Sequence, residues 1–276
     1  MAPLKIYYLS AEVAPFSDTY RLASFSREVT NKLHLNTEID IRVSKPKYGF
    51  VSERKYILRE VIRLRDIPIT FNKETHIVNV KSSFIPDTRV QVYFLENNSL
   101  YKELPELIYK ARNGRVYNDI DIRFAFFSKA VIDTLQSLFW RPDIIICNDW
   151  QTSIVPALFK EQFINQEFYS GIKTVYLIHS INDYQNYSNL SYKMLNIDYP
   201  KGAKKINNHI QAMDNADLTI LINYASNNMI EKMQQDEEMY KKFQSSKHLV
   251  IDVPDKVDRE KWSEISSIIE TACKDL

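Results

Sequence analysis

The sequence predicts an α/β protein: a single doubly wound, Rossmann-like domain with a mainly parallel sheet, spanning residues 1–276. Two observations support this prediction. Short apolar runs rich in β-branched and aromatic residues alternate along the chain with helical patterns long enough to cross a sheet. No internal repeat, Gly/Ser linker or low-complexity segment interrupts them, so we expect one domain.

The first third of the chain is predicted to begin with strand, helix and strand. Residues 6–9, Ile-Tyr-Tyr-Leu, are typical of a buried parallel strand. A helix is expected at about 19–33, because three good N-cap residues, Ser17, Asp18 and Thr19, precede it. Polarity alternates over 38–43 and predicts the second strand. Runs at 56–64, 76–83 and 89–95, separated by turn residues, predict several antiparallel strands.

The rest of the chain alternates more regularly. Residues 100–118 are polar and are expected to form a loop around a short helix, before a buried helix at 120–138. Strands are expected at 140–147, 174–178, 218–222 and 248–252. Helices are expected from about 149 to 163, from 225 to 243 and from 259 to 274. In an open α/β sheet, ligands bind beyond the carboxyl ends of the strands, so the loops after 9, 147 and 178 are candidate sites.

Composition excludes several functional classes. The hydrophobic content of 45% and charged content of 26% are ordinary for a globular protein, and a net charge of +1 gives no reason to expect nucleic acid or an anionic membrane as partner. No apolar run approaches the roughly 20 residues of a membrane helix, and no secretory leader is evident, so a cytoplasmic protein is expected. The two cysteines, Cys147 and Cys273, show no metal-ligand spacing, so no metal site is expected.

Glycine is scarce. The chain has four glycines, whereas an average frequency of about 7% would give about 19. Neither a Gly-x-Gly-x-x-Gly pattern nor a Walker A loop occurs. Nucleotide enzymes place glycines where the backbone approaches phosphate, so the sequence predicts no bound cofactor. Compositional drift is the alternative explanation, although drift does not by itself remove glycines that catalysis needs.

Residues 10–16, Ser-Ala-Glu-Val-Ala-Pro-Phe, resemble the opening of bacterial glycogen and starch synthases, which are glucosyltransferases of the GT-B fold. That family continues with Lys-Thr-Gly-Gly, where the lysine and glycines serve the sugar nucleotide. Here Asp18 replaces the lysine, and Tyr20 and Arg21 replace the glycines. The resemblance therefore implies a retained scaffold that has lost its phosphate chemistry. The candidate ligand-binding residues of this stretch are Glu12, Pro15, Phe16 and Thr19.

Two further stretches resemble the same family. Asn148, Asp149 and Trp150 stand where the family has His-Asp-Trp, whose histidine belongs to the active site. Asparagine hydrogen-bonds a sugar hydroxyl but does not exchange a proton near neutral pH. Alternatively, Asp149 caps the next helix and Trp150 packs beneath it. The family's Ile-His-Asn and Tyr-Gln-Gly correspond to residues 178–180 and 184–186. The candidates of these two stretches are Asn148, Asp149, Trp150, His179, Tyr184 and Gln185.

The resemblance extends from residue 5 to about 230 and implies the N-terminal half of a GT-B glycosyltransferase, with the C-terminal GT-B domain expected to be absent. We assign no catalytic residue and expect impaired catalysis by this chain alone. Three functions remain open. The chain binds glucan or a protein of glycogen metabolism; or a partner chain completes a glycosyltransferase that moves glucose from a nucleotide sugar to an α-1,4-glucan; or it is a scaffold or dimerisation protein. Expected partners are an α-glucan, a protein or a second copy of the chain.

Overall fold

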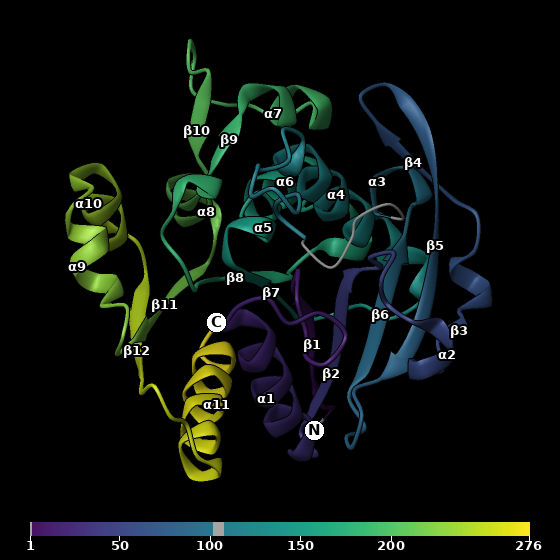
Figure 1. The fold of residues 1–276 in the computed structure, drawn as a ribbon, viewed down its shortest axis with the longest axis horizontal. Coiled ribbons are helices and arrows are strands. Elements are labelled where there is room, and N and C mark those ends of the chain that lie inside the picture. Colours follow the sequence, from purple (N-terminus) through teal and green to yellow (C-terminus); the bar gives the residue numbers. More distant parts are fainter. Residues whose placement is uncertain (1, 102–107) are drawn as a thin grey trace.

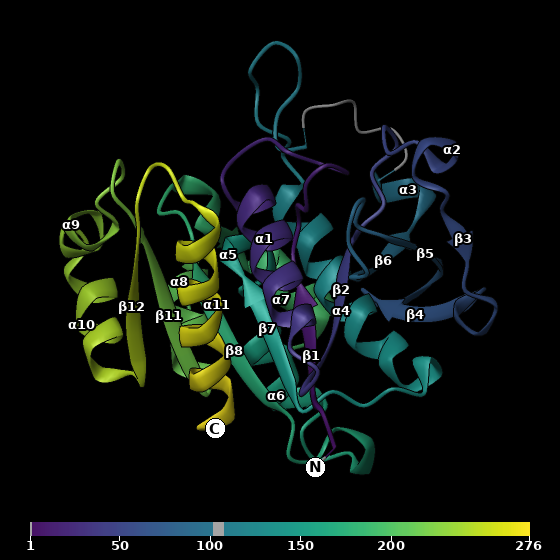
Figure 2. The ribbon, with the colours of Figure 1, turned by 90° about the horizontal axis from the view of Figure 1, so that it is seen from below.

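The structure is a computed structural model that describes residues 2–101 and 108–276. A ten-stranded mixed sheet with helices on both faces runs through the molecule, which confirms the predicted α/β class (Figure 1; Figure 2). Seven neighbouring strands are parallel to one another. In spatial order they are β12 (His248–Val253), β11 (Leu218–Tyr224), β8 (Lys173–Ile178), β7 (Ile144–Asn148), β1 (Leu4–Leu9), β2 (Ile39–Pro46) and β6 (Gln91–Glu96).

Antiparallel strands extend the sheet beyond β6. They are β5 (Glu74–Phe84), β3 (Arg59–Glu60) and β4 (Ile67–Phe71), of which β3 and β4 both pair with β5. A separate antiparallel pair is formed by β9 (Asn186–Ser188) and β10 (Lys205–Asn207).

Helices cover both faces of the sheet. On one face α1 (Leu22–Leu35) lies beside α11 (Arg259–Lys274), as both ribbon views show. The opposite face is covered by α4 (Ile120–Leu138), α6 (Val155–Gln162) and α8 (Asn208–Asn215). The remaining α-helices are α2 (Glu53–Tyr56), α3 (Asn98–Tyr101), α5 (Asp149–Thr152), α7 (Asn189–Leu195), α9 (Met229–Gln234) and α10 (Glu237–Ser245). The short 3-10 helices are η1 (Ile62–Leu64), η2 (Glu167–Tyr169) and η3 (Asp183–Gln185).

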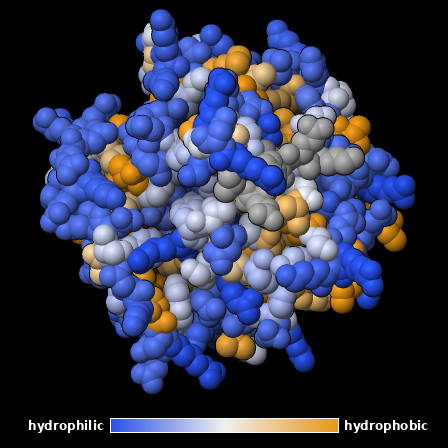
Figure 3. Space-filling model, viewed as in Figure 1, coloured by the Kyte–Doolittle hydropathy of each residue, from blue (hydrophilic) through white to orange (hydrophobic). Residues whose placement is uncertain are grey.

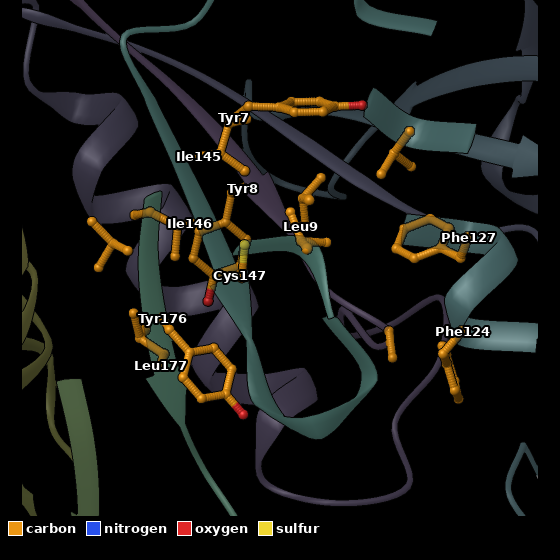
Figure 4. Close-up of a cluster of buried hydrophobic side chains, with 14 of the residues drawn as sticks. Tyr7, Tyr8, Leu9, Phe124, Phe127, Ile145, Ile146, Cys147, Tyr176 and Leu177 are labelled. Atoms are coloured by element: carbon orange, nitrogen blue, oxygen red, sulfur yellow. The ribbon is translucent and has the colours of Figure 1, made fainter. Parts of the chain in front are cut away.

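The central strands are apolar along their whole length because helices bury both of their faces. All five residues of β7 are buried, and so are the last four of β1. Figure 4 shows side chains of β1, β7 and β8 packed together, with Phe124 and Phe127 of α4 beside them. This core fixes the ends of the three strands whose following loops form the candidate site.

Several predicted elements are confirmed and others need correction. The helices at 120–138 and 259–274 have the predicted bounds. The first helix begins later, at Leu22, because the Thr19 side chain bonds to Glu12 instead of capping a helix. The predicted strand at 56–64 is wrong: this stretch contains the end of α2, the two-residue β3 and η1.

Three other corrections concern helix continuity and strand direction. The expected helix after β7 is split into α5 and α6, and the one at 225–243 is split into α9 and α10, where Asp236 caps α10. Strand β6 is parallel to β2 and antiparallel only to β5. Of the loop expected at 100–118, residues 102–107 lie outside the described part. Beyond them, Lys110 and Val116 form an isolated antiparallel bridge.

The chain order places a topological switch between β1 and β7. From β1 the chain builds outward through β2 to β6, and it then returns to the other side of β1 to form β7, β8, β11 and β12. Loops on either side of such a point run in opposite directions and leave a crevice at the carboxyl ends of the strands. Among the described residues, no helix is both long and apolar enough to cross a bilayer.

Candidate functional site

A cavity of about 470 Å³ opens at the carboxyl ends of β1, β7 and β8, where the switch point predicts a site. The loop after β1, the turn after β7, the loop after β8 and the segment before α4 each contribute to its wall. The lining residues are Thr19, Tyr20, Ile108, Tyr109, Lys110, Trp150, Ser180, Asn182 and Tyr184.

Aromatic rings form much of this wall. The ring of Tyr184 stacks on that of Trp150, with centroids 5.2 Å apart and an interplanar angle of 17°. Tyr109 lies 5.4 Å from Trp150 and 6.0 Å from Tyr20, centroid to centroid. Trp150 is buried, whereas Tyr109 and Tyr184 are half-buried. The cavity therefore offers aromatic faces beside hydroxyl, amide and ammonium groups, a combination typical of small-molecule sites.

Glu12 is buried behind this wall and organises the loop after β1. One carboxylate oxygen accepts the backbone N–H of Thr19 at 2.6 Å. The other accepts the Thr19 hydroxyl at 2.6 Å and the Tyr109 hydroxyl at 2.7 Å. Burial raises the pKa of Glu12, while the Thr19 and Tyr109 donors act in the opposite direction. Glu12 thus ties its own loop to the segment before α4.

Lys45, in β2, is a fully buried lysine near this loop. Its Nζ donates to the carbonyl of Pro46 at 3.0 Å and lies 4.6 Å from the centroid of the Tyr48 ring. Burial lowers the pKa of Lys45 to about 7, against the opposing effect of the Glu12 carboxylate. Lys45 does not line the cavity, so it does not replace the cation that the family carries at position 18.

Asp149 holds the loop after β8 in place. Its backbone is left-handed, with φ 58°, and its side chain is fully buried. One carboxylate oxygen accepts the N–H groups of His179 and Ser180 at 3.1 and 3.0 Å. The other accepts the hydroxyls of Ser180 at 2.7 Å and Tyr20 at 3.0 Å. Burial raises the pKa of Asp149 to about 6, and these donors limit the rise.

The side chains of Asn148 and His179 are hydrogen-bonded to each other. The Asn148 amide donates to the carbonyl of Leu9 at 2.8 Å, and its oxygen lies 3.1 Å from His179 Nε2, which therefore carries the proton. His179 Nδ1 accepts from the hydroxyl of Tyr224 at 3.1 Å. Burial lowers the pKa of His179 to about 3, so its ring is neutral at pH 7. Both side chains are buried, and neither lines the cavity.

Arg21, at the end of the loop after β1, contacts residues at the ends of β11 and β12. Its guanidinium donates to Ser226 Oγ and Asp255 Oδ1, both at 2.9 Å, and lies 5.1 Å from the centroid of the Tyr224 ring. A position that is glycine in the family thus carries a side chain that links the loops after β1, β11 and β12.

The structure divides the ten predicted residues into three groups. The residues that line the cavity are Thr19, Trp150 and Tyr184. The residues buried behind its wall are Glu12, Asn148, Asp149 and His179. The residues that lie elsewhere are Pro15, Phe16 and Gln185. Phe16 packs on Tyr56 and Phe94, Pro15 is exposed, and Gln185 closes the capping box of η3.

The alternative prediction, that Asp149 caps the next helix and Trp150 packs beneath it, is also partly wrong. Asp149 does not cap a helix, because its carboxylate is engaged by Tyr20 and by the loop after β8. Trp150 does pack among aromatic side chains, and it also reaches the cavity.

Several lining residues were not among the predicted candidates. Tyr20 was noted in the sequence only because it replaces a glycine of the family motif. Ser180 was noted only because it replaces the asparagine of the family's Ile-His-Asn. Tyr109 and Lys110 belong to a polar segment whose periodicity gives no signal of a site. Within the described residues, no group of three or more His, Cys, Asp or Glu side chains is arranged to hold a metal ion.

Comparisons with known proteins agree with the fold and with the motifs. Residues 5–244 match the family model described as the starch synthase catalytic domain. The chain is 38% identical over 186 residues to the glycogen synthase of Chlorobium phaeovibrioides and 36% identical over 177 residues to that of Pelodictyon phaeoclathratiforme. Each match covers 64% of this chain and 36% of the relative, so the chain matches about a third of the length of these relatives.

A solved structure shows the same fold. The catalytic domain of starch synthase IV from Arabidopsis thaliana, bound to ADP and acarbose, superposes with a TM-score of 0.74 at 17% identity, covering 95% of this chain and 53% of that one. With the family model matched over most of its length, the chain belongs to the starch synthase catalytic domain family, a family of glycogen and starch synthase-like glycosyltransferases.

Proposed function

We propose that this chain binds an α-glucan through the cavity beyond β1, β7 and β8, and that it is catalytically impaired on its own. The observation that carries the proposal is the cavity wall itself. Tyr109 and Tyr184, both half-buried, offer aromatic surface of the kind on which sugar rings stack, with Trp150 packed behind Tyr184, and Ser180 and Asn182 supply hydrogen-bonding groups beside them.

The hydrogen bonds already made by Asp149 and His179 support the proposal of impaired catalysis. Asp149 accepts four hydrogen bonds, and His179 is neutral and bonded at both ring nitrogens. A general base needs a free site within reach of the proton that it removes, and neither group has one. Transfer of glucose from a nucleotide sugar also needs stabilisation of the departing phosphates, and position 18 carries a carboxylate instead of a cation.

Native affinity electrophoresis tests the proposal. The purified chain is expected to migrate more slowly in a gel that contains glycogen, and free maltooligosaccharide should restore its mobility. Tyr184→Ala removes one stacking face and should reduce the retardation. Tyr240→Ala is the matched control, because Tyr240 lies on α10, outside the cavity. Unchanged mobility of the unmodified protein in glycogen would overturn the proposal.

A glycosyltransferase completed by a partner chain is the second candidate, and it rests on the match to the starch synthase catalytic domain family. It predicts transfer of glucose from ADP-glucose or UDP-glucose to glucan only after cell extract is added to the chain. Transfer by the chain alone would contradict both this candidate and our proposal of impaired catalysis.

A scaffold or dimerisation protein is the third candidate. It predicts stable self-association without glucan binding, which sedimentation velocity would detect. On the face shown in Figure 3, hydrophobic residues are scattered among hydrophilic ones and form no broad continuous patch. That face therefore gives no support to a large apolar interface.

A further inference from the structure

The ten-stranded sheet has two edges, which differ in how much open backbone they present. At one edge lies β3, which is only two residues long. At the other lies β12, which is six residues long and pairs with β11 alone among the described residues (Figure 2). Three common protections of an edge strand are short length, a proline and a bulge. Strand β12 has none of them, so its edge is open to pairing with another strand.

The backbone of β12 presents a regular set of unpaired groups at this edge. Its odd-numbered residues face β11, because the carbonyls of Lys247 and Val253 accept N–H groups from that side of the sheet at 3.0 and 2.9 Å. Successive residues of a strand direct their N–H and C=O groups to opposite sides. His248, Val250 and Asp252 therefore direct these groups away from β11. All three residues are exposed, and no described residue hydrogen-bonds to their backbone.

This pattern selects one antiparallel register for two copies of the edge. Residues whose backbone groups point outward must oppose one another, and each such pair exchanges both of its N–H···O bonds. A twofold axis through Val250 gives the longest overlap. Val250 then opposes its own copy, and His248 opposes Asp252 of the second copy at both ends of the pairing.

Side-chain charge favours the same register. Opposite charges on directly opposed residues of an antiparallel pair stabilise it, and like charges destabilise it. With the axis at Val250, each Asp252 carboxylate lies opposite the imidazole of His248, a group able to carry positive charge. An axis at Asp252 would oppose two carboxylates. One Asp252 oxygen accepts from the Asn223 amide at 2.7 Å, and its other oxygen remains for the imidazole.

An apolar groove continues this edge. A cavity of about 420 Å³ lies beside the start of β12, and its apolar lining residues are Leu218, Leu249, Ile268 and Ala272. Lys247 and His248 also line it, so the groove and the strand edge form one continuous surface. Ile268, on α11, is 37% exposed. A second copy seated on the edge would cover part of this apolar surface and add hydrophobic stabilisation to the backbone pairing.

We propose that two copies of this chain associate through β12, as an antiparallel pair centred on Val250 that joins their sheets into one. The same edge serves both copies, so the assembly closes at a dimer. The proposal goes beyond glucan binding and does not depend on it, because β11 separates β12 from the strands whose loops line the cavity beyond β1, β7 and β8.

Cysteine cross-linking tests the register. Val250→Cys places two thiols opposite each other across the twofold axis, where the Cα atoms of a hydrogen-bonded pair lie about 5.5 Å apart, within the range of a disulfide. Mild oxidation is expected to convert most of this variant into a covalent dimer on a non-reducing gel. Val116→Cys is the matched control and should stay monomeric, since Val116 is 41% exposed and Val250 38%. Equal cross-linking of the two variants, or none in either, would overturn the register.

Sedimentation velocity tests the dimer without a new bond. The unmodified chain is expected to shift from monomer to dimer as its concentration rises. Val250→Pro should stay monomeric, because proline removes the outward N–H and leaves the pairing with β11 intact. Val250→Thr keeps that N–H and should dimerise as the unmodified chain does. A chain that stays monomeric up to about 100 µM, or a Val250→Pro variant that still dimerises, would overturn the proposal.

Exchange of the two opposed side chains tests the charge pairing. His248→Asp opposes two carboxylates at each end and should weaken the dimer about tenfold. The double variant His248→Asp/Asp252→His restores an unlike pair at each end and should recover most of the affinity. Failure of this rescue in a variant that thermal unfolding shows to be folded would contradict the register.

The outcomes also separate this proposal from glucan binding. Val250→Pro should lose the dimer and keep its retardation by glycogen, whereas Tyr184→Ala should keep the dimer and lose retardation. A chain that dimerises through β12 and is not retarded by glycogen would leave the edge proposal standing and overturn glucan binding. Retardation of a chain that never dimerises would overturn the edge proposal alone.

Discussion

Lowering the pH from 7 to 4 should destabilise the folded chain, because two buried histidines must stay neutral. His179 lies between Asn148 and Tyr224, and burial lowers its pKa to about 3. His209 donates from Nε2 to the carbonyl of Ser180 at 2.9 Å, and burial lowers its pKa to about 4. In the unfolded chain both regain a pKa near 6.5. Below that pH the unfolded state binds more protons, so the free energy of unfolding falls.

The size of this loss of unfolding free energy follows from the pH range over which each group is protonated in only one of the two states. Each pH unit is equivalent to about 1.4 kcal/mol per proton, so between pH 6.5 and 4 the two histidines together cost about 7 kcal/mol. Asp149 acts in the opposite direction. Its pKa is raised to about 6, so below that pH the folded state binds the extra proton and regains about 3 kcal/mol by pH 4. For these three groups alone the expected net loss is about 4 kcal/mol, and the raised pKa of the buried Glu12 carboxyl makes the loss smaller.

Urea unfolding at pH 7, 6, 5 and 4 measures this loss. His179→Gln keeps a donor and an acceptor but removes the titration, so the loss between pH 7 and 4 should shrink by about 3 kcal/mol. His248→Gln, at an exposed histidine on β12, is the matched control and should retain the full loss. A free energy of unfolding that stays constant or rises towards pH 4 would refute the assignment of His179 as a neutral structural group.

Three further changes test the site's internal contacts by urea unfolding. Glu12→Gln replaces an acceptor with a donor in a cluster of three accepted hydrogen bonds, so it should cost about 2 kcal/mol; a cost near zero would mean that those bonds do not hold the loop. Trp150→Ala should cost about 3–5 kcal/mol because the ring is buried, whereas Tyr184→Ala, half-buried, should cost clearly less; equal costs would contradict this packing. Arg21→Ala should cost less than about 1 kcal/mol, because its ion pair with Asp255 is largely exposed; a larger cost would show that this contact fixes the loop.

Apolar patterning was sufficient to predict the architecture but not its irregular parts. The helix at 120–138 was predictable to the residue, because phenylalanines and aliphatic residues occupy most of its surface. The strand expected at 56–64 failed because strand propensity depends on packing against neighbouring side chains, and this edge segment has little of it: Ile62 is 88% exposed.

The motifs brought the right loops together without revealing which side chains face the cavity. Glu12 and Asp149 were predicted as ligand contacts, yet both carboxylates are satisfied by the protein itself. Some of the hydrogen bonds that satisfy them come from Tyr109 and Tyr20, which are distant in sequence from the carboxylates they bind. Pairings of this kind depend on tertiary packing, and neither periodicity nor a local motif encodes them.

Calorimetric titration of the unmodified chain with maltoheptaose tests the central claim most directly. The account predicts saturable binding at one site per chain. It also predicts that Tyr184→Ala weakens the affinity about tenfold, because one aromatic stacking face is lost, while Tyr240→Ala leaves it unchanged. An absence of binding, or equal affinity for the unmodified chain and Tyr184→Ala, would contradict the claim that this cavity holds a glucan.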